Sequence, residues 1–156
     1  LSEVVLGAAR LGAANDAVDA AAAAVLGVNR TDLRIIGLVQ ETGALAAGPL
    51  AAAAHLSPAA TSTAIQRLVA AGYLTREVDP ADRRRAVVRL TPEASAQLDR
   101  LYGPIEQAGR RELARYTVAE LTVILDFLRR GERMQLGQAA RIRELGPPTG
   151  AARVGA

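Results

Sequence analysis

Three consecutive arginines, Arg83, Arg84 and Arg85, form the densest group of ligand-binding side chains in this sequence. They follow Asp82 and lie in a segment, 57–90, that holds six arginines against three acidic residues. The rest of the chain carries 13 arginines and 13 acidic residues, so the net charge of +3 arises entirely within this segment. A local basic patch on an otherwise balanced protein is what a polyanion-binding surface requires.

The sequence gives little support for catalysis. It holds one histidine, His55, and no cysteine, which excludes disulfides, zinc–cysteine sites, thiol switches and multi-histidine metal sites. The acidic residues are scattered, and the glycines form no phosphate-binding loop. We therefore expect no catalytic residue, no metal and no cofactor. An enzyme is the least favoured class, and His55 is expected to cap a helix or lie on the surface.

The composition favours a soluble, cytoplasmic protein. The chain has 156 residues, of which 50% are hydrophobic and 22% charged, enough for one domain or a compact two-part subunit. Its longest apolar run, 20–28, is less than half of a membrane span. Glu3 precedes every basic residue, which is unlike a signal peptide. We expect no membrane partner.

A helix from Pro58 to about Ala71 is the element that could present side chains to a ligand. Ser57 as N-cap and Pro58 at the first position predict its start, and Gly72 its end. The inward side is expected to hold Thr61, Ala64, Ile65, Leu68 and Val69. The outward side holds small hydroxyl, amide and methyl groups that could approach base edges in a major groove, namely those of Ala59, Ser62, Thr63, Gln66 and Ala70, flanked by Arg67. A plainer interpretation is an ordinary exposed face, and the residues alone leave both open.

The neighbouring elements predict a helix-turn-helix followed by a hairpin. One helix is expected to start near Thr31 and stop at Gly43, with Leu33, Ile36, Gly37 and Gln40 on one face. A short helix follows over 50–55. About two residues then separate this helix from Ser57, which is the spacing of a helix-turn-helix. Alternating apolar residues predict strands at 74–78 and 86–90, joined by a cationic turn at 79–85.

Long helices are predicted on both sides of this segment. The first covers 1–27 and repeats Val4, Leu11 and Val18 every seven residues, a seam suited to a partner helix. The second runs from Pro92 to about Arg115, and a capping box at Thr117 opens the third, which ends near Leu145. The second helix should bury Leu98, Leu101 and Ile105, and the third Leu121, Ile124, Leu125 and Leu128. These helices could also pack only on their own domain.

In this order, the elements resemble the MarR family of winged-helix transcription regulators. Residues 56–74 are similar to the family's recognition helix and the strand after it. The run from Asp79 to Arg85, followed by Val88, Leu90 and Thr91, resembles the family's wing pattern. The resemblance implies a mainly α fold with a small β-hairpin wing. It implies an N-terminal dimerisation helix at 1–30, a winged helix-turn-helix at 31–91, C-terminal dimerisation helices at 92–145 and a tail at 146–156.

The resemblance also implies a homodimer on a pseudo-palindromic operator in double-stranded DNA. Recognition helices would enter successive major grooves and wings the adjacent minor grooves. Arg84 would be the wing residue in the minor groove, oriented by Asp82, while Arg83 and Arg85 would contact phosphates. Asp82 could equally serve as a turn former. The dimer contacts would come from Val4, Leu11, Val18, Leu121, Ile124, Leu125 and Leu128.

We expect Thr63 and Gln66 to contact bases, supported by Ala59, Ser62 and Arg67. The function expected from the resemblance is a sequence-specific transcriptional regulator, most simply a repressor released by a small-molecule effector. Two other functions stay open. A winged helix could serve only dimerisation or protein contact, or the protein could bind DNA as an architectural factor without sequence preference.

Overall fold

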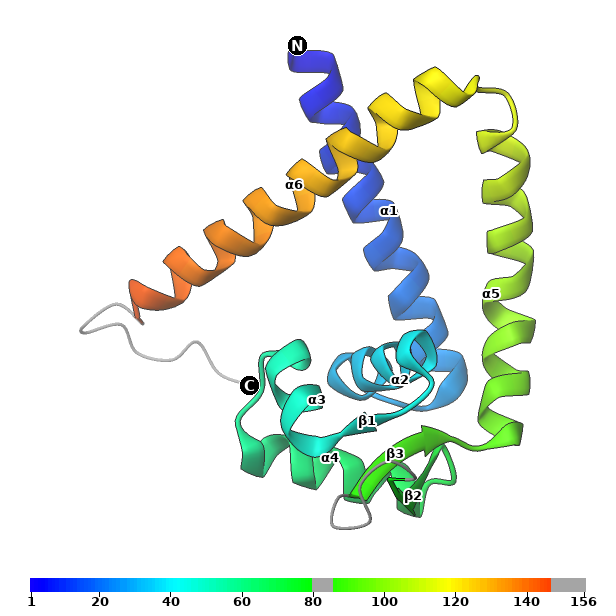
Figure 1. Cartoon of the computed structure of the whole chain (residues 1–156), viewed down its shortest axis with the longest axis vertical. Coiled ribbons are helices and arrows are strands. Elements are labelled where there is room, and N and C mark those ends of the chain that lie inside the picture. Colours follow the sequence, from blue (N-terminus) through cyan, green and yellow to red (C-terminus); the bar gives the residue numbers. More distant parts are fainter. Residues whose placement is uncertain (80–85, 147–156) are drawn as a thin grey trace. The chain divides into compact units, whose positions relative to one another are not determined.

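The computed structural model describes residues 1–79 and 86–146, and within them the chain forms six helices and three short strands (Figure 1). It divides into two compact units, Leu1–Ile105 and Glu106–Ala156. The elements in chain order are α1 (Ser2–Leu26), α2 (Arg30–Thr42), β1 (Leu45–Ala46), α3 (Ala47–Ala54), α4 (Pro58–Ala70), β2 (Leu74–Val78), β3 (Ala86–Leu90), α5 (Pro92–Leu113) and α6 (Val118–Glu144).

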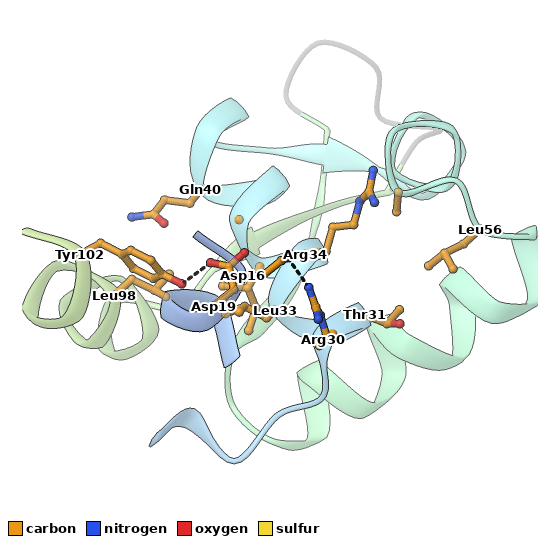
Figure 2. A pocket seen from close by; sticks show the side chains of 13 residues that line it. Asp16, Asp19, Arg30, Thr31, Leu33, Arg34, Gln40, Leu56, Leu98 and Tyr102 are labelled. Carbon is orange, nitrogen blue, oxygen red and sulfur yellow. Dashed lines mark hydrogen bonds and ion pairs between the residues drawn. The ribbon is translucent and has the colours of Figure 1, made fainter. Parts of the chain in front are cut away.

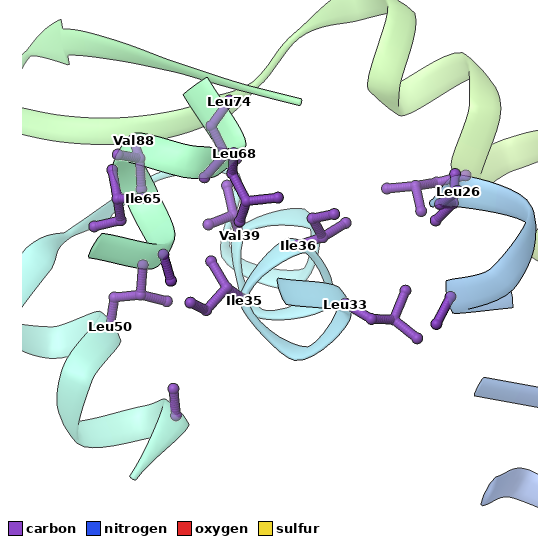
Figure 3. Close-up of a cluster of buried hydrophobic side chains, with 14 of the residues drawn as sticks. Leu26, Leu33, Ile35, Ile36, Val39, Leu50, Ile65, Leu68, Leu74 and Val88 are labelled. Carbon is purple, nitrogen blue, oxygen red and sulfur yellow. The ribbon is translucent and has the colours of Figure 1, made fainter. Parts of the chain in front are cut away.

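The core of the first unit forms around α2 (Figure 3). Ile35, Ile36 and Val39 are fully buried, because α2 contacts α1, α3, α4 and β3 on different sides. The end of α1 contributes Leu26, and α5 contributes Leu98. The remaining large side chains of the core are Leu33, Leu50, Ile65, Leu68, Leu74 and Val88.

Helix α2 is buried on several sides, which differs from the single face that the sequence predicted. Gln40 and Gly37 are exposed, whereas Asp32, Ile35 and Val39 are buried at spacings of three and four residues. The N-cap is Asn29 rather than Thr31, since the Asn29 side chain accepts a hydrogen bond of 2.8 Å from the Asp32 backbone N–H. A side-chain oxygen in this position satisfies a backbone donor that the first helical turn leaves unpaired.

Helices α3 and α4 form the expected helix-turn-helix (Figure 1). Three residues separate them, and His55 ends α3 in the left-handed conformation (φ 54°), which confirms its capping position. The short helix begins at Ala47 rather than Leu50, so that Pro49 lies in its first turn, where a proline removes no hydrogen bond that the helix needs.

The sheet has three antiparallel strands in the order β1-β3-β2. The hairpin strands β2 and β3 pair as expected, with Leu74 opposite Leu90 and Val78 opposite Ala86. Strand β1 was not expected. Its two residues pair with Val88 and Val87, too short a segment for any alternation of apolar residues to reveal.

The long helices follow the expected boundaries closely. In α5, Leu98 is buried and Leu101 half-buried, whereas Ile105 is 47% exposed, contrary to expectation. Helix α5 continues through Pro104. The capping box at the start of α6 is confirmed, because Glu120 accepts from the Thr117 backbone N–H at 2.8 Å and Thr117 Oγ1 accepts from the Glu120 N–H at 3.3 Å.

The interior positions expected for α6 are wrong for the single chain. None of its residues is buried: Leu121 and Ile124 are half-buried, and Leu125 and Leu128 are 46% and 52% exposed. In other respects the predicted fold class, a mainly helical winged helix-turn-helix with a small β-hairpin, is confirmed.

Candidate nucleic-acid interface

Helix α4 is positioned by its cap and by one buried face. The Ser57 hydroxyl oxygen accepts a hydrogen bond of 3.2 Å from the Ala60 backbone N–H, and Pro58 opens the helix. Thr61 is fully buried, and its hydroxyl is satisfied because it donates to the Ser57 carbonyl at 3.0 Å. The rest of the buried face consists of Ala64, Ile65 and Leu68. Val69, expected on this face, is 36% exposed.

The opposite face of α4 is exposed and carries small polar groups. Ala59, Ser62, Thr63 and Gln66 are all exposed, as expected. The Thr63 hydroxyl donates to the Ala59 carbonyl at 3.1 Å, which fixes the side chain and leaves its oxygen available as an acceptor. Short hydroxyl and amide side chains of this kind can reach base edges in a major groove.

Arg67 lies beside this face but is bound to another helix. Its Nε donates to Asp32 Oδ2 at 2.8 Å and its Nη2 to Asp32 Oδ1 at 2.6 Å. The hydrogen bond and the charge of Asp32 raise the pKa of the guanidinium. The sequence analysis did not predict this pair. Helical spacing could have indicated it, because Asp32 lies three and seven residues before Ile35 and Val39 and so shares their buried side of α2.

The predicted wing tip lies outside the described residues, which omit 80–85. Nothing in the structure therefore tests the predicted roles of Asp82, Arg83, Arg84 and Arg85. The structure describes the two strands of the hairpin, and Arg89 on β3 connects them to each other and to Gly43, shortly before β1. Its Nε lies 3.0 Å from Glu77 Oε2 on β2, and its Nη1 donates to the Gly43 carbonyl at 3.2 Å. Arg76 is exposed on β2.

The residues predicted to form a dimer are largely open to solvent in the single chain. On α1, Val4 and Leu11 are each 58% exposed and Val18 is 38% exposed. Only Ala22, Ala23 and Leu26, near the end of α1, are buried. Helix α6 also carries exposed apolar residues that the sequence analysis did not predict, namely Val123, Phe127 and Met134.

A cavity of about 670 Å³ opens in the first unit, between α1, α2 and α5 (Figure 2). An ion pair of 2.7 Å joins Arg30 to Asp16 at its rim. Tyr102 donates to Asp19 Oδ1 at 3.5 Å, and burial, followed by the charge of Asp19, raises the pKa of this phenol. Apolar side chains complete the lining, among them Leu33, Ile36, Leu56 and Leu98.

The part of the chain that the structure describes holds no group of three or more side chains suited to bind a metal ion. Within the same residues, no single helix is long and apolar enough to cross a membrane. Among these residues, α1 and α2 reach the length and apolar composition of a membrane span only when they are taken together, and the two helices are bent by 97° where they join.

Comparisons with known proteins agree with this geometry. A model of the MarR family matches residues 26–85, from the end of α1 to the end of the basic turn. The uncharacterized HTH-type transcriptional regulator YcgE of Bacillus subtilis (strain 168) is 34% identical over 124 residues, which cover 80% of this chain and 75% of the relative.

Solved structures give the same result for the fold. A MarR-family transcriptional regulator from Silicibacter pomeroyi superposes with a TM-score of 0.58 at 26% identity, covering 78% of this chain and 82% of that one. A second MarR-family regulator, from Silicibacter pomeroyi DSS, superposes with a TM-score of 0.62 at 22% identity, covering 83% of this chain and 85% of that one. The chain belongs to the MarR family of DNA-binding transcriptional regulators.

Proposed function

We propose that the chain acts as a homodimeric, sequence-specific DNA-binding repressor that a small-molecule effector releases from its operator. The observation that carries the proposal is the contrast between the two faces of α4. One face is anchored in the core through Ile65 and Leu68, and the other presents Ser62, Thr63 and Gln66 to solvent. A recognition helix needs both, because base edges are read only by side chains on a firmly held element.

In the proposed complex, α4 enters the major groove. Gln66 is suited to bidentate hydrogen bonding with adenine, and the Thr63 hydroxyl and methyl groups suit several base edges. Ala59 and Ser62 lie at the end of α4 that follows the turn, where they would contact the adjacent backbone or bases. The N–H groups of this first turn also favour phosphate oxygens.

The wing would supply contacts on the minor-groove side. By the family pattern Arg84 enters the groove, Asp82 orients it, and Arg83 and Arg85 bind phosphates. The ion pair between Arg89 and Glu77 supports this arrangement, because it braces the hairpin from which the turn extends. Arginine is suited to a narrow minor groove, whose negative potential is enhanced.

Dimerisation would occur through the terminal helices, 1–30 and 92–145, leaving 31–91 to bind DNA. The support is the apolar surface that a single chain leaves uncovered on α1 and α6. Val4, Leu11, Leu125 and Leu128 are each between 46% and 58% exposed. Exposed apolar side chains that recur along one helix, as they do on each of these two helices, are typical of an interface with another chain. A two-fold dimer would require a pseudo-palindromic operator.

The cavity beside α2 is the proposed effector site. Its volume of about 670 Å³ lies within the usual range of small-molecule pockets. Its lining residues come from α1, α2, α5 and the end of α3, so a ligand would contact both a dimerisation helix and the DNA-binding segment. A ligand that binds only one relative placement of these helices would shift the protein between DNA-bound and free states.

Fluorescence anisotropy tests the proposal. The protein is titrated into labelled DNA from upstream of its own gene and into a scrambled control, each at two salt concentrations. We expect tight, salt-sensitive binding to the native fragment, because DNA binding releases condensed counterions. Equal binding to both fragments would indicate an architectural protein. Absence of binding to either would favour a protein-interaction module.

A further inference from the structure

Asp32 is the only charged residue that is buried in the part of the chain that the structure describes. It lies in the first turn of α2, where the helix dipole favours a negative charge. Its two carboxylate oxygens accept separate hydrogen bonds from Arg67, at 2.8 Å and 2.6 Å. This is the bidentate geometry in which an arginine binds a carboxylate or a phosphate most strongly.

Arg67 differs from its partner in exposure. The side chain of Asp32 is 3% exposed, whereas that of Arg67 is 48% exposed. Arg67 directly follows Gln66 and lies one helical turn after Thr63, at the border of the face proposed to read bases. A half-exposed arginine in this place would ordinarily bind a DNA phosphate. Here the carboxylate of Asp32 already binds the Nε and Nη2 groups and balances the positive charge.

We infer that Asp32 limits the sequence-independent affinity of the protein for DNA, because it occupies the Arg67 guanidinium in place of a DNA phosphate. The inference rests on the proposed DNA-binding function. Arg67 then adds nothing to the binding that every sequence shares, and the pair instead holds α4 against α2. Phosphate contacts raise affinity for all sequences equally, whereas base contacts discriminate. Withholding one arginine from the phosphates therefore lowers the affinity for operator and for other DNA by the same factor.

The choice of variant follows from the unequal burial of the pair. Removal of Arg67 alone would leave the Asp32 carboxylate buried without a partner, which destabilises a fold strongly. Asp32→Asn instead leaves a neutral amide in the same space and frees a guanidinium that solvent can reach. Asp126→Asn is the matched control, because it makes the same charge change and frees Arg130, its partner at 2.8 Å on α6.

Binding to operator and scrambled DNA is measured by anisotropy across a salt series. For Asp32→Asn we expect the plot of log affinity against log salt for scrambled DNA to steepen by about one unit per protomer. Affinity should rise several-fold for scrambled DNA and for the operator alike, so the ratio of the two affinities should stay the same. Asp126→Asn should change both affinities little. An unchanged slope and unchanged affinities in Asp32→Asn would overturn the inference.

A second variant tests the inference even if Asp32→Asn does not fold. Asp32→Asn/Arg67→Gln replaces the ion pair by two amides that can hydrogen-bond to each other and keeps the net charge. If Arg67 makes no phosphate contact in the wild type, the salt slope of the double variant equals the wild-type slope. A slope lower by about one unit per protomer would show that Arg67 binds phosphate and would refute the role of Asp32.

The same titrations separate this inference from the proposed function. If wild-type protein binds neither DNA at any salt concentration, the proposed function fails and the inference fails with it. If the wild type binds its operator but Asp32→Asn keeps the wild-type slope, or the double variant loses about one unit of slope per protomer, only the role of Asp32 is refuted. Circular dichroism of each variant establishes that it is folded.

Discussion

Substitution of two adjacent residues on α4 should separate folding from DNA recognition. Ile65 is 1% exposed, and its neighbour Gln66 is exposed on the opposite face. Ile65→Ala removes a fully buried side chain and leaves a cavity, at a cost of about 2–5 kcal/mol in the free energy of unfolding. For a chain of this size, even the lower value shifts Tm by about 4 °C or more.

Gln66→Ala should give the opposite result. A surface substitution of this kind changes the free energy of unfolding by no more than about 0.5 kcal/mol. Loss of a base contact, however, costs about 1–3 kcal/mol of binding at each half-site. This corresponds to a factor of about five to more than one hundred in Kd for each half-site, and to the square of that factor for a dimer on both half-sites.

The assays are thermal unfolding by circular dichroism, at fixed protein concentration, and anisotropy against operator DNA. Concentration must be fixed because association of chains itself raises Tm. Gln66→Ala with unchanged operator affinity would refute the assignment of this face to base contacts. Ile65→Ala with an unchanged Tm would contradict the packing of α4 on α2.

Four further outcomes are expected. Arg84→Ala should weaken operator binding by about 1–3 kcal/mol while sedimentation still reports a dimer; unaltered affinity would remove this residue from the wing contacts. Leu121→Arg should sediment as a monomer, since it places a charge in the proposed interface, and a wild-type sedimentation profile would disprove the placement. Ser57→Ala should lower the free energy of unfolding by about 1 kcal/mol, because the α4 cap is lost, whereas an unchanged melting curve would mean that the cap is not used. The hydrogen bond from the Thr117 N–H holds the pKa of Glu120 below its ordinary value of 4.5. The ionised carboxylate therefore stabilises the fold above that pH, and this stabilisation is lost as the pH falls through the lower pKa of Glu120 in the folded protein. Glu120→Gln should therefore show a flatter dependence of Tm on pH between about 6 and 3 than the wild type.

Local signals in the sequence predicted most of the elements. The pairs Ser57-Pro58 and Thr117-Glu120 mark helix starts by satisfying backbone groups within three residues, so no distant contact is needed to interpret them. Gly72 adopts a positive φ of 78° after α4, a conformation that glycine tolerates without steric cost. The exposed face of α4 followed from helical periodicity in the same way.

Predictions failed where burial depends on distant elements. Gln40 was expected to share a face with Leu33 and Ile36, yet it is exposed and Val39 is buried, because α2 is enclosed on several sides and periodicity assumes a single buried face. Strand β1 has only two residues and exists because β3 offers an unpaired edge. The apolar residues of α6 were expected in the interior, yet a single chain leaves Leu125 and Leu128 about half exposed.

The sequence by itself determined the order of elements, the concentration of positive charge in 57–90 and the small polar face of α4, because each depends on neighbours within a few helical turns. Only the tertiary structure decided the partner of Arg67. Asp32 lies 35 residues away in the chain, and the two side chains meet because α2 and α4 pack together in the core. Hydrogen bonds of this range follow from packing, which no local pattern encodes, so an arginine that the sequence assigns to DNA is held by the protein itself.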